Sequence, residues 1–169
     1  MLYRRLTCLF LLSTLSLAAC ENVDYTFNER VIFTSGELFR DFEVADAALR
    51  DCITQTIADN GIRAAGQLTD LNCSNAGIAD LDGLARFSGL LRLRLSSNAV
   101  RNLVELQALA SLQELYLDHN RIVDPVPLYA LPGLRFLDLS GNPELQCPSS
   151  GGLPQVETVI LPRHCRQDR

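Results

Sequence analysis

The sequence predicts a solenoid, a fold in which short coils of chain stack on one another, and two observations support this prediction. The pattern Leu-x-x-Leu-x-Leu-x-x-Asn begins at Leu90, Leu112 and Leu134, so each copy starts 22 residues after the previous one. A fixed period of that size is typical of stacked repeats. Within each copy, the alternating Leu-x-Leu spacing indicates a short strand and is not helical spacing, which argues against an ordinary helical bundle.

Apolar positions continue in the same register beyond these three copies. Each coil of a solenoid buries its inward side chains only against the coils before and after it, so the same columns stay apolar. Steps of 22 residues align five coils, whose strand columns are Leu68, Leu90, Leu112, Leu134, Val156; Leu71, Leu93, Leu115, Leu137, Val159; and Cys73, Leu95, Leu117, Leu139, Leu161. We therefore expect one continuous core along the stack.

An asparagine column follows the strands, at Asn98, Asn120 and Asn142. An amide side chain both donates and accepts hydrogen bonds, so it is able to satisfy backbone groups where the chain bends inward. The column is interrupted at both ends, by Ala76 in the first coil and His164 in the last. This predicts terminal coils that differ from the central ones.

Together these motifs resemble the leucine-rich repeat family, in the 22-residue class found in internalin-like bacterial proteins, over about residues 46–165. The resemblance implies an α/β fold, a solenoid with a curved parallel sheet on the concave face and one short strand per coil. It also implies short helical or irregular turns on the convex face. The repeats and a C-terminal cap are assigned to residues 68–169.

Residues 46–67 are expected to form a helical N-terminal cap over the first coil. Asp46 is a suitable N-cap residue, and Asn60-Gly61 is a suitable helix stop. One face of the expected helix carries apolar side chains, namely Leu49, Cys52, Ile53 and Ile57. This face should cover the open end of the core.

Residues 1–19 are expected to be a signal peptide and not part of the fold. Arg4 and Arg5 precede an apolar stretch, residues 6–17, that is too short to span a bilayer. It ends in Leu-Ala-Ala-Cys20, which resembles the lipobox of bacterial lipoproteins. The resemblance implies cleavage before Cys20 and its lipidation, including palmitate. The alternative is an ordinary secretory signal in which Cys20 occurs by chance.

The residue after Cys20 is Glu21, not the Asp that marks inner-membrane retention in enteric lipoproteins, so the resemblance implies a lipid-anchored protein of the bacterial outer membrane. Residues 20–45 are assigned to a lipid-anchored tether and N-terminal segment. We expect its second half to pack partly on the first coil, because it contains Phe33, Phe39 and Phe42.

Four cysteines remain after residue 20, and they allow three disulfide connectivities. Cys52 lies on the apolar face of the expected helix and Cys73 in an inward column, whereas Cys147 and Cys165 flank the last coil. We predict the pairs Cys52–Cys73 and Cys147–Cys165, since exported chains meet an oxidising compartment. The alternative, a metal site formed by Cys147, His164 and Cys165, lacks the usual Cys-x-x-Cys spacing.

The side chains between the inward leucines should point to the concave face, because strand side chains alternate. Steps of 22 residues bring Arg92, Arg94, Tyr116 and Phe136 close together, and arginine and aromatic residues are enriched at binding hot spots. An equally weighted alternative is that Arg92 and Arg94 pair with Glu114 and Asp138 as solvated charge. The candidate protein-binding residues are Arg92, Arg94, Glu114, Tyr116, Phe136 and Asp138.

Composition argues against several other functions. The net charge of −5 disfavours nucleic-acid binding. No Gly-x-Ser-x-Gly or phosphate-binding loop occurs, so we expect no enzyme, no cofactor and no small-molecule substrate. The expected function is a non-catalytic protein-binding module on the bacterial envelope, on its periplasmic or surface side. Alternatives are a structural spacer or assembly factor, or a surface adhesin-like protein.

Overall fold

The computed structural model describes residues 25–27, 30–33, 37–148, 153 and 156–165. It divides into two units, Met1–Glu37 and Leu38–Arg169. In the first unit, strands β1 (Tyr25–Phe27) and β2 (Arg30–Phe33) form an antiparallel hairpin. Both strands lie in the segment assigned to the tether, for which the sequence predicted no strands. The signal peptide and Cys20 lie outside the described residues.

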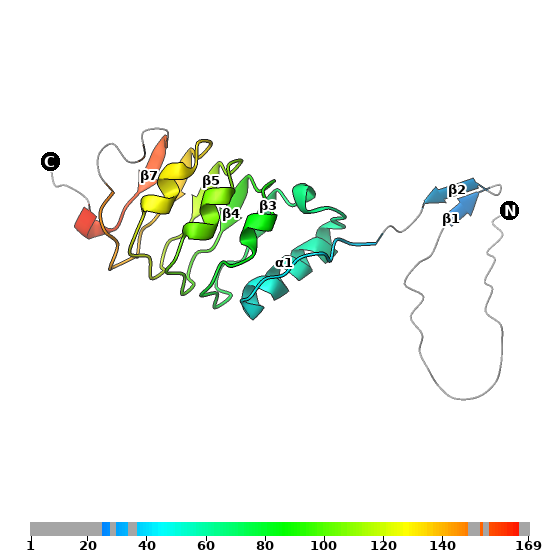
Figure 1. Cartoon of the computed structure of the whole chain (residues 1–169), viewed down its shortest axis with the longest axis horizontal. Coiled ribbons are helices and arrows are strands. Elements are labelled where there is room, and N and C mark those ends of the chain that lie inside the picture. Colours follow the sequence, from blue (N-terminus) through cyan, green and yellow to red (C-terminus); the bar gives the residue numbers. More distant parts are fainter. Residues whose placement is uncertain (1–24, 28–29, 34–36, 149–152, 154–155, 166–169) are drawn as a thin grey trace, which may run out of the picture. The chain divides into compact units, whose positions relative to one another are not determined.

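The second unit is built on a five-stranded parallel sheet with one strand per coil (Figure 1). The strands pair in chain order, as β3 (Asp70–Asn72), β4 (Arg92–Arg94), β5 (Glu114–Tyr116), β6 (Phe136–Asp138) and β7 (Thr158–Ile160). Short 3-10 turns connect the coils, as η1 (Ala65–Gln67), η2 (Leu84–Arg86), η3 (Val104–Ala108), η4 (Val126–Ala130) and η5 (Arg163–Cys165). The α/β solenoid is confirmed.

The register of the sheet keeps each apolar column in line. Leu71 pairs with Leu93, Leu93 with Leu115, and Leu115 with Leu137 on consecutive strands. All four leucine side chains are completely buried. The last coil is less enclosed, because Val159 is only partly buried against the core.

An asparagine ladder joins the coils, as expected. Asn120 Oδ1 accepts from the N–H of Val100 at 3.0 Å, while Nδ2 donates to the carbonyls of Leu95 (2.8 Å) and Leu117 (3.1 Å). Leu95 belongs to the preceding coil and Leu117 to the same coil, so one amide binds two coils together. Asn142 repeats this arrangement one coil later, and its side chain is completely buried.

Helix α1 (Ala47–Asn60) covers the first coil, which confirms the helical N-terminal cap. Asp46 Oδ1 accepts from the N–H of Leu49 at 3.1 Å, as an N-cap does. Its Oδ2 accepts from the N–H groups of Ala79 and Asp80 in the first coil, at 2.9 and 3.2 Å. A single carboxylate therefore caps the helix and fastens it to the repeats. The helix ends at Gly61, whose backbone is left-handed.

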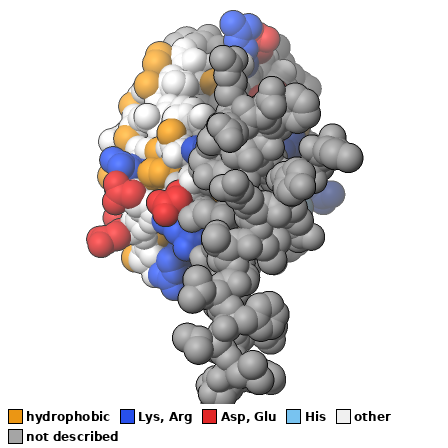
Figure 2. Space-filling view, turned by 90° about the vertical axis from the view of Figure 1, so that its right-hand side faces the viewer, with side chains coloured by type: hydrophobic (Ala, Val, Ile, Leu, Met, Phe, Trp, Pro, Cys, Tyr) orange, Lys and Arg blue, Asp and Glu red, His pale blue; other side chains and the backbone are white. Residues whose placement is uncertain are grey.

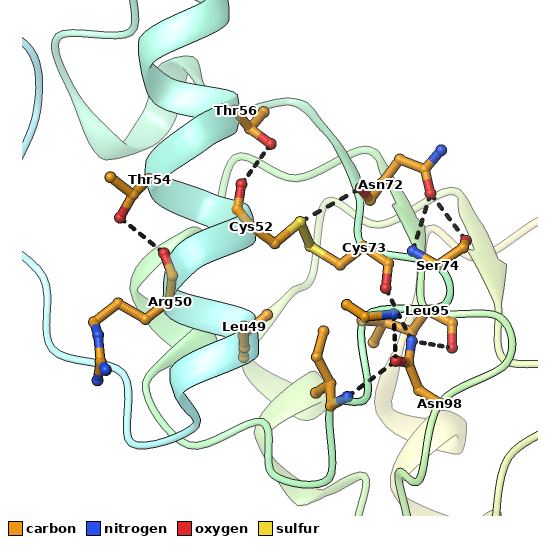
Figure 3. The surroundings of a disulfide bond; sticks show 12 residues. Leu49, Arg50, Cys52, Thr54, Thr56, Asn72, Cys73, Ser74, Leu95 and Asn98 are labelled. Carbon is orange, nitrogen blue, oxygen red and sulfur yellow. Dashed lines mark hydrogen bonds between the residues drawn. A yellow bond between two sulfur atoms is a disulfide. The ribbon is translucent and has the colours of Figure 1, made fainter.

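One disulfide lies between the cap and the first coil, where Cys52 of α1 is bonded to Cys73 (Figure 3). Beside it, Asn98 Nδ2 donates to the carbonyl of Cys73 at 2.9 Å. Asn98 Oδ1 accepts from the backbone N–H groups of the first coil's turn, which are those of Ala76, Gly77 and Ile78. The ladder therefore reaches the first coil even though Ala76 occupies its asparagine position.

The second disulfide joins Cys147 to Cys165 around the last coil. Of the three connectivities open to the four cysteines, the structure has the one with a bond at each end of the solenoid. Both thiols near His164 are consumed by this bond, so the Cys147, His164 and Cys165 group does not offer two thiolates to a metal ion.

Candidate protein-binding surface

The six candidate residues occupy two rows on three neighbouring strands. Arg92, Glu114 and Phe136 pair in one row. Arg94, Tyr116 and Asp138 pair in the other. All six side chains are partly exposed, whereas the leucines between them are buried. The parallel strands thus bring residues that lie 22 positions apart in the sequence onto one surface.

Arg92 is the centre of an ion-pair network on this surface. It binds Glu114 through two hydrogen bonds, from Nε at 2.6 Å and from Nη2 at 3.0 Å. Its Nη1 also binds Asp70 at 2.7 Å, and Asp70 in turn accepts from Arg94 at 3.1 Å. The pairing of Arg92 with Glu114 agrees with the alternative that the arginines are paired as surface charge.

The pairing expected between Arg94 and Asp138 is wrong. Arg94 turns toward Asp70 on the other side, and Asp138 forms no ion pair with any residue in the described part of the chain. Asp138 instead accepts from the backbone N–H of Ser140 at 2.9 Å. Asp70 was not among the predicted site residues, although its position beside Arg92 in the row was readable from the sequence.

The network changes the proton affinities of its members. Hydrogen bonds that Arg92 donates to Glu114 and to Asp70 raise the pKa of its guanidinium above the ordinary value. Hydrogen bonding to Arg92 is the main cause that lowers the pKa of Glu114. Exposed pairs of this kind contribute little to stability. Their main effect here is to hold the side chains in fixed positions.

Aromatic contacts continue the surface toward the later coils. The rings of Tyr116 and Phe136 lie 4.8 Å apart between centroids, and the guanidinium of Arg94 lies 5.2 Å from the centre of the Tyr116 ring. The Tyr116 hydroxyl donates to Glu114 at 3.2 Å. Burial, followed by the charge of Glu114, raises the pKa of Tyr116, so the phenol stays neutral and able to donate. We call Arg94, Tyr116 and Phe136 the aromatic patch.

Asp118 and His119 form the pair of side chains that most resembles part of a catalytic site within the described residues. His119 Nδ1 lies 3.0 Å from Asp118, a carboxylate that also accepts from Ser96. Burial raises the pKa of Asp118, but the hydrogen bonds from Ser96 and His119 outweigh this effect and lower it. Within the described ranges, no hydrogen bond joins His119 to a serine or cysteine side chain.

The repeats of this chain are similar to repeats of known proteins. A family model described as leucine-rich repeats (2 copies) matches residues 110–159. The structure of internalin F from Listeria monocytogenes is similar with a TM-score of 0.61 at 23% sequence identity, over 70% of this chain and 37% of that chain. The fold is a leucine-rich-repeat solenoid.

Two further solved structures contain similar leucine-rich repeats. A leucine-rich-repeat protein of Leptospira interrogans is 29% identical with a TM-score of 0.52, over 57% of this chain and 26% of that chain. The functional domain of internalin J from Listeria monocytogenes is 27% identical with a TM-score of 0.50, over 57% of this chain and 20% of that chain. This chain therefore spans well under half of these proteins. Curated protein sequences include no match.

The described surface seen in Figure 2 is mixed in charge. Where Figure 2 shows described residues, acidic and basic side chains lie next to one another, with hydrophobic side chains between them. Within the described residues, no helix has the length and hydrophobicity needed to cross a membrane. Solenoids of this kind use extended concave surfaces for binding, and in this chain the aromatic patch lies on that surface.

Proposed function

We propose that the chain is a non-catalytic protein-binding module, held on the bacterial outer membrane by a lipid on Cys20, and that its concave face binds the partner. The observation that supports this most is the aromatic patch, where Arg94 lies 5.2 Å from the Tyr116 ring and Phe136 lies 4.8 Å beyond it. Arginine and tyrosine are among the residues that dominate binding energies at interfaces.

The patch is also fixed in place before any partner arrives. Asp70 holds Arg94 from one side, and Glu114 holds the hydroxyl of Tyr116. Side chains that are already ordered lose less conformational entropy on binding, so more of the contact energy appears as affinity. The ion pairs of Arg92 with Asp70 and Glu114 therefore support the binding hypothesis, since the same two carboxylates hold Arg94 and Tyr116.

The experiment is in-cell crosslinking from a photoreactive residue at position 94 or position 116, followed by mass spectrometry. We expect both positions to crosslink to the same partner. Positions 101 and 129 serve as controls, because Arg101 pairs with Glu144 at an exposed site and Tyr129 lies on η4. Different partners from positions 94 and 116, or the same partner from all four, would contradict concave-face binding.

A variant carrying Arg94→Ala and Tyr116→Ala tests the patch itself. Removal of a hot-spot side chain costs about 2 kcal/mol or more, so capture of the crosslinked partner should fall by at least tenfold. The matched control is Arg101→Ala with Tyr129→Ala, which should capture the partner as the wild type does. Thermal melting of both variants shows that the fold is retained.

The lipid anchor is tested separately at Cys20, which lies outside the described residues. Cys20→Ala should prevent metabolic labelling with palmitate and move the protein from the membrane fraction to the soluble fraction. Protease treatment of whole cells then distinguishes surface display from a periplasmic position. Retention of Cys20→Ala in the outer-membrane fraction would remove this part of the proposal and leave the binding face untouched.

A second candidate function is a structural spacer or assembly factor that packs against other envelope proteins through the convex face. Val104 on η3 and Val126 on η4 are 53% and 56% exposed and lie 22 residues apart, in one column. If Val104→Ser with Val126→Ser abolishes partner capture while the Arg94 and Tyr116 double variant does not, the convex face is the binding face.

A further inference from the structure

A cavity of about 460 Å³ lies at the edge of the sheet where the last strands end. It contains both histidines of the chain. Its lining residues come from three consecutive coils, and they are His119, Ser140, Gly141, Asn142, Pro143, Leu161, Pro162, Arg163 and His164. The two histidines are 45 residues apart in the sequence, and the stacking of the coils brings them to the same cavity.

Gly141 keeps the cavity open. It occupies the middle of a column in which His119 stands one coil earlier and Arg163 one coil later. Its φ of +69° suits glycine, and a Cβ here would lie only 2.8 Å from Cδ2 of the His119 ring. Any other residue at position 141 would place a side chain in the space between His119 and Arg163. Glycine leaves this space unfilled.

Both imidazoles are oriented by hydrogen bonds to acceptors of the protein. His164 Nε2 lies 2.9 Å from the carbonyl oxygen of Leu145, which only accepts, so this nitrogen carries a proton. His119 Nδ1 donates in the same way to Asp118, at 3.0 Å. The other ring nitrogens, Nε2 of His119 and Nδ1 of His164, have no hydrogen-bond partner in the described part of the chain.

The charge of the cavity is opposite to that of the chain. No carboxylate is among the lining residues, although the chain has a net charge of −5. Arg163 forms no ion pair with a described residue, in contrast to Arg92 and Arg94. The lining thus offers one guanidinium and two imidazoles.

We propose that this cavity binds an oxyanion, a carboxylate or phosphate group, between Arg163 and the two histidines. Arg163 supplies the permanent charge, since a guanidinium matches the geometry of both kinds of anion. Asp118 faces His119, and the Leu145 carbonyl and the Cys147–Cys165 bond face His164. The site is independent of the concave face.

The test follows the imidazole signals of the full repeat protein by NMR during titration with N-acetylglycine, inorganic phosphate or uncharged N-acetylglycinamide. We expect the two anions to shift both histidine signals saturably, and the amide to have no effect. The ratio of the two anion affinities distinguishes a carboxylate source from a phosphate source.

Arg163→Gln provides the decisive variant, because its side chain is exposed and its loss should not unfold the protein. Loss of a charged hydrogen bond should weaken anion binding about tenfold. Arg121→Gln is the matched control, an exposed arginine outside the cavity, and should bind as the wild type does. Equal affinity in Arg163→Gln and wild type, or shifts by Zn²⁺ but by neither anion, would overturn the proposal.

Discussion

The amide of Asn120 and the carbonyl of Leu95 are joined by a 2.8 Å hydrogen bond that runs from one coil to the coil before it. The same amide also binds the carbonyl of Leu117 in its own coil. Asn120 is 4% exposed, so water has little access to replace these bonds. Cohesion between coils therefore depends on buried polar groups as well as on leucine packing.

Asn120→Ala should lower the free energy of unfolding by about 3 kcal/mol, because it leaves buried backbone groups without partners at about 1–3 kcal/mol each. Urea denaturation measures this change. Gln107→Ala is the matched control, since Gln107 is an exposed amide on η3. A loss no larger than that of the control would mean that the ladder is not stabilising.

Leu115→Ala at the centre of the stack should cost about 2–5 kcal/mol, since it removes a completely buried side chain and leaves a cavity. Leu91→Ala is the control, because Leu91 is 40% exposed. The free energy of unfolding should fall much less in Leu91→Ala, measured by the same urea denaturation. Similar losses for the two variants would argue against a core confined to the inward columns.

Cys52→Ala with Cys73→Ala should lower stability by about 3 kcal/mol in the chain-entropy description of a loop of this size. The bond closes a separation of 21 residues and holds α1 on the first coil. Thermal melting with and without reductant measures the effect. Reductant should lower the Tm of the wild type more than that of the variant, which keeps only the Cys147–Cys165 bond; equal decreases would contradict a stabilising role for Cys52–Cys73.

Asp46 should make stability depend on acid pH. Burial raises its pKa, but hydrogen bonds from Ala79, Leu49 and Asp80 outweigh burial and lower it below the ordinary 3.8. A carboxyl whose pKa is depressed by folding stabilises the protein above its unfolded pKa, and this contribution is lost as the pH falls through the folded value.

The matched variant for this prediction is Asp46→Asn, which keeps a capping side chain but does not titrate. The Tm difference between wild type and Asp46→Asn should be constant above about pH 5 and should shrink below about pH 4. Differential scanning calorimetry across this range measures it. A Tm difference that does not change with pH would show that the charge of Asp46 does not contribute to stability.

The period of 22 residues was enough to predict the stack, the asparagine ladder and the two rows of the candidate surface. Each of these depends on residues repeating at equal steps, and the parallel register then places them side by side. The partner of Arg94 was not predictable in this way. Asp70 lies on the strand next to that of Arg94, whereas Asp138 lies two strands away with Tyr116 between them. Whether Arg94 turns toward Asp70 depends on side-chain rotamers that the repeat does not encode.

The β1–β2 hairpin was also missed. Its strands have three and four residues, too short for a clear alternation, although Tyr25-Thr26-Phe27 and Val31-Ile32-Phe33 are rich in strand-forming residues. The composition of this segment therefore favoured strands, but its sequence showed no periodicity that would have predicted them. Short strands of this kind become definite only when a partner strand supplies hydrogen bonds.

The sequence by itself determined the solenoid, because a coil that buries its leucines only against its neighbours imposes the same residue at every step. It also determined which side chains share the concave face. Only the tertiary structure decided that Asp70 holds Arg94, and that His119, Gly141 and Arg163 line an open cavity with His164. Those relationships depend on the angles of individual side chains and on what each finds in the adjacent coil.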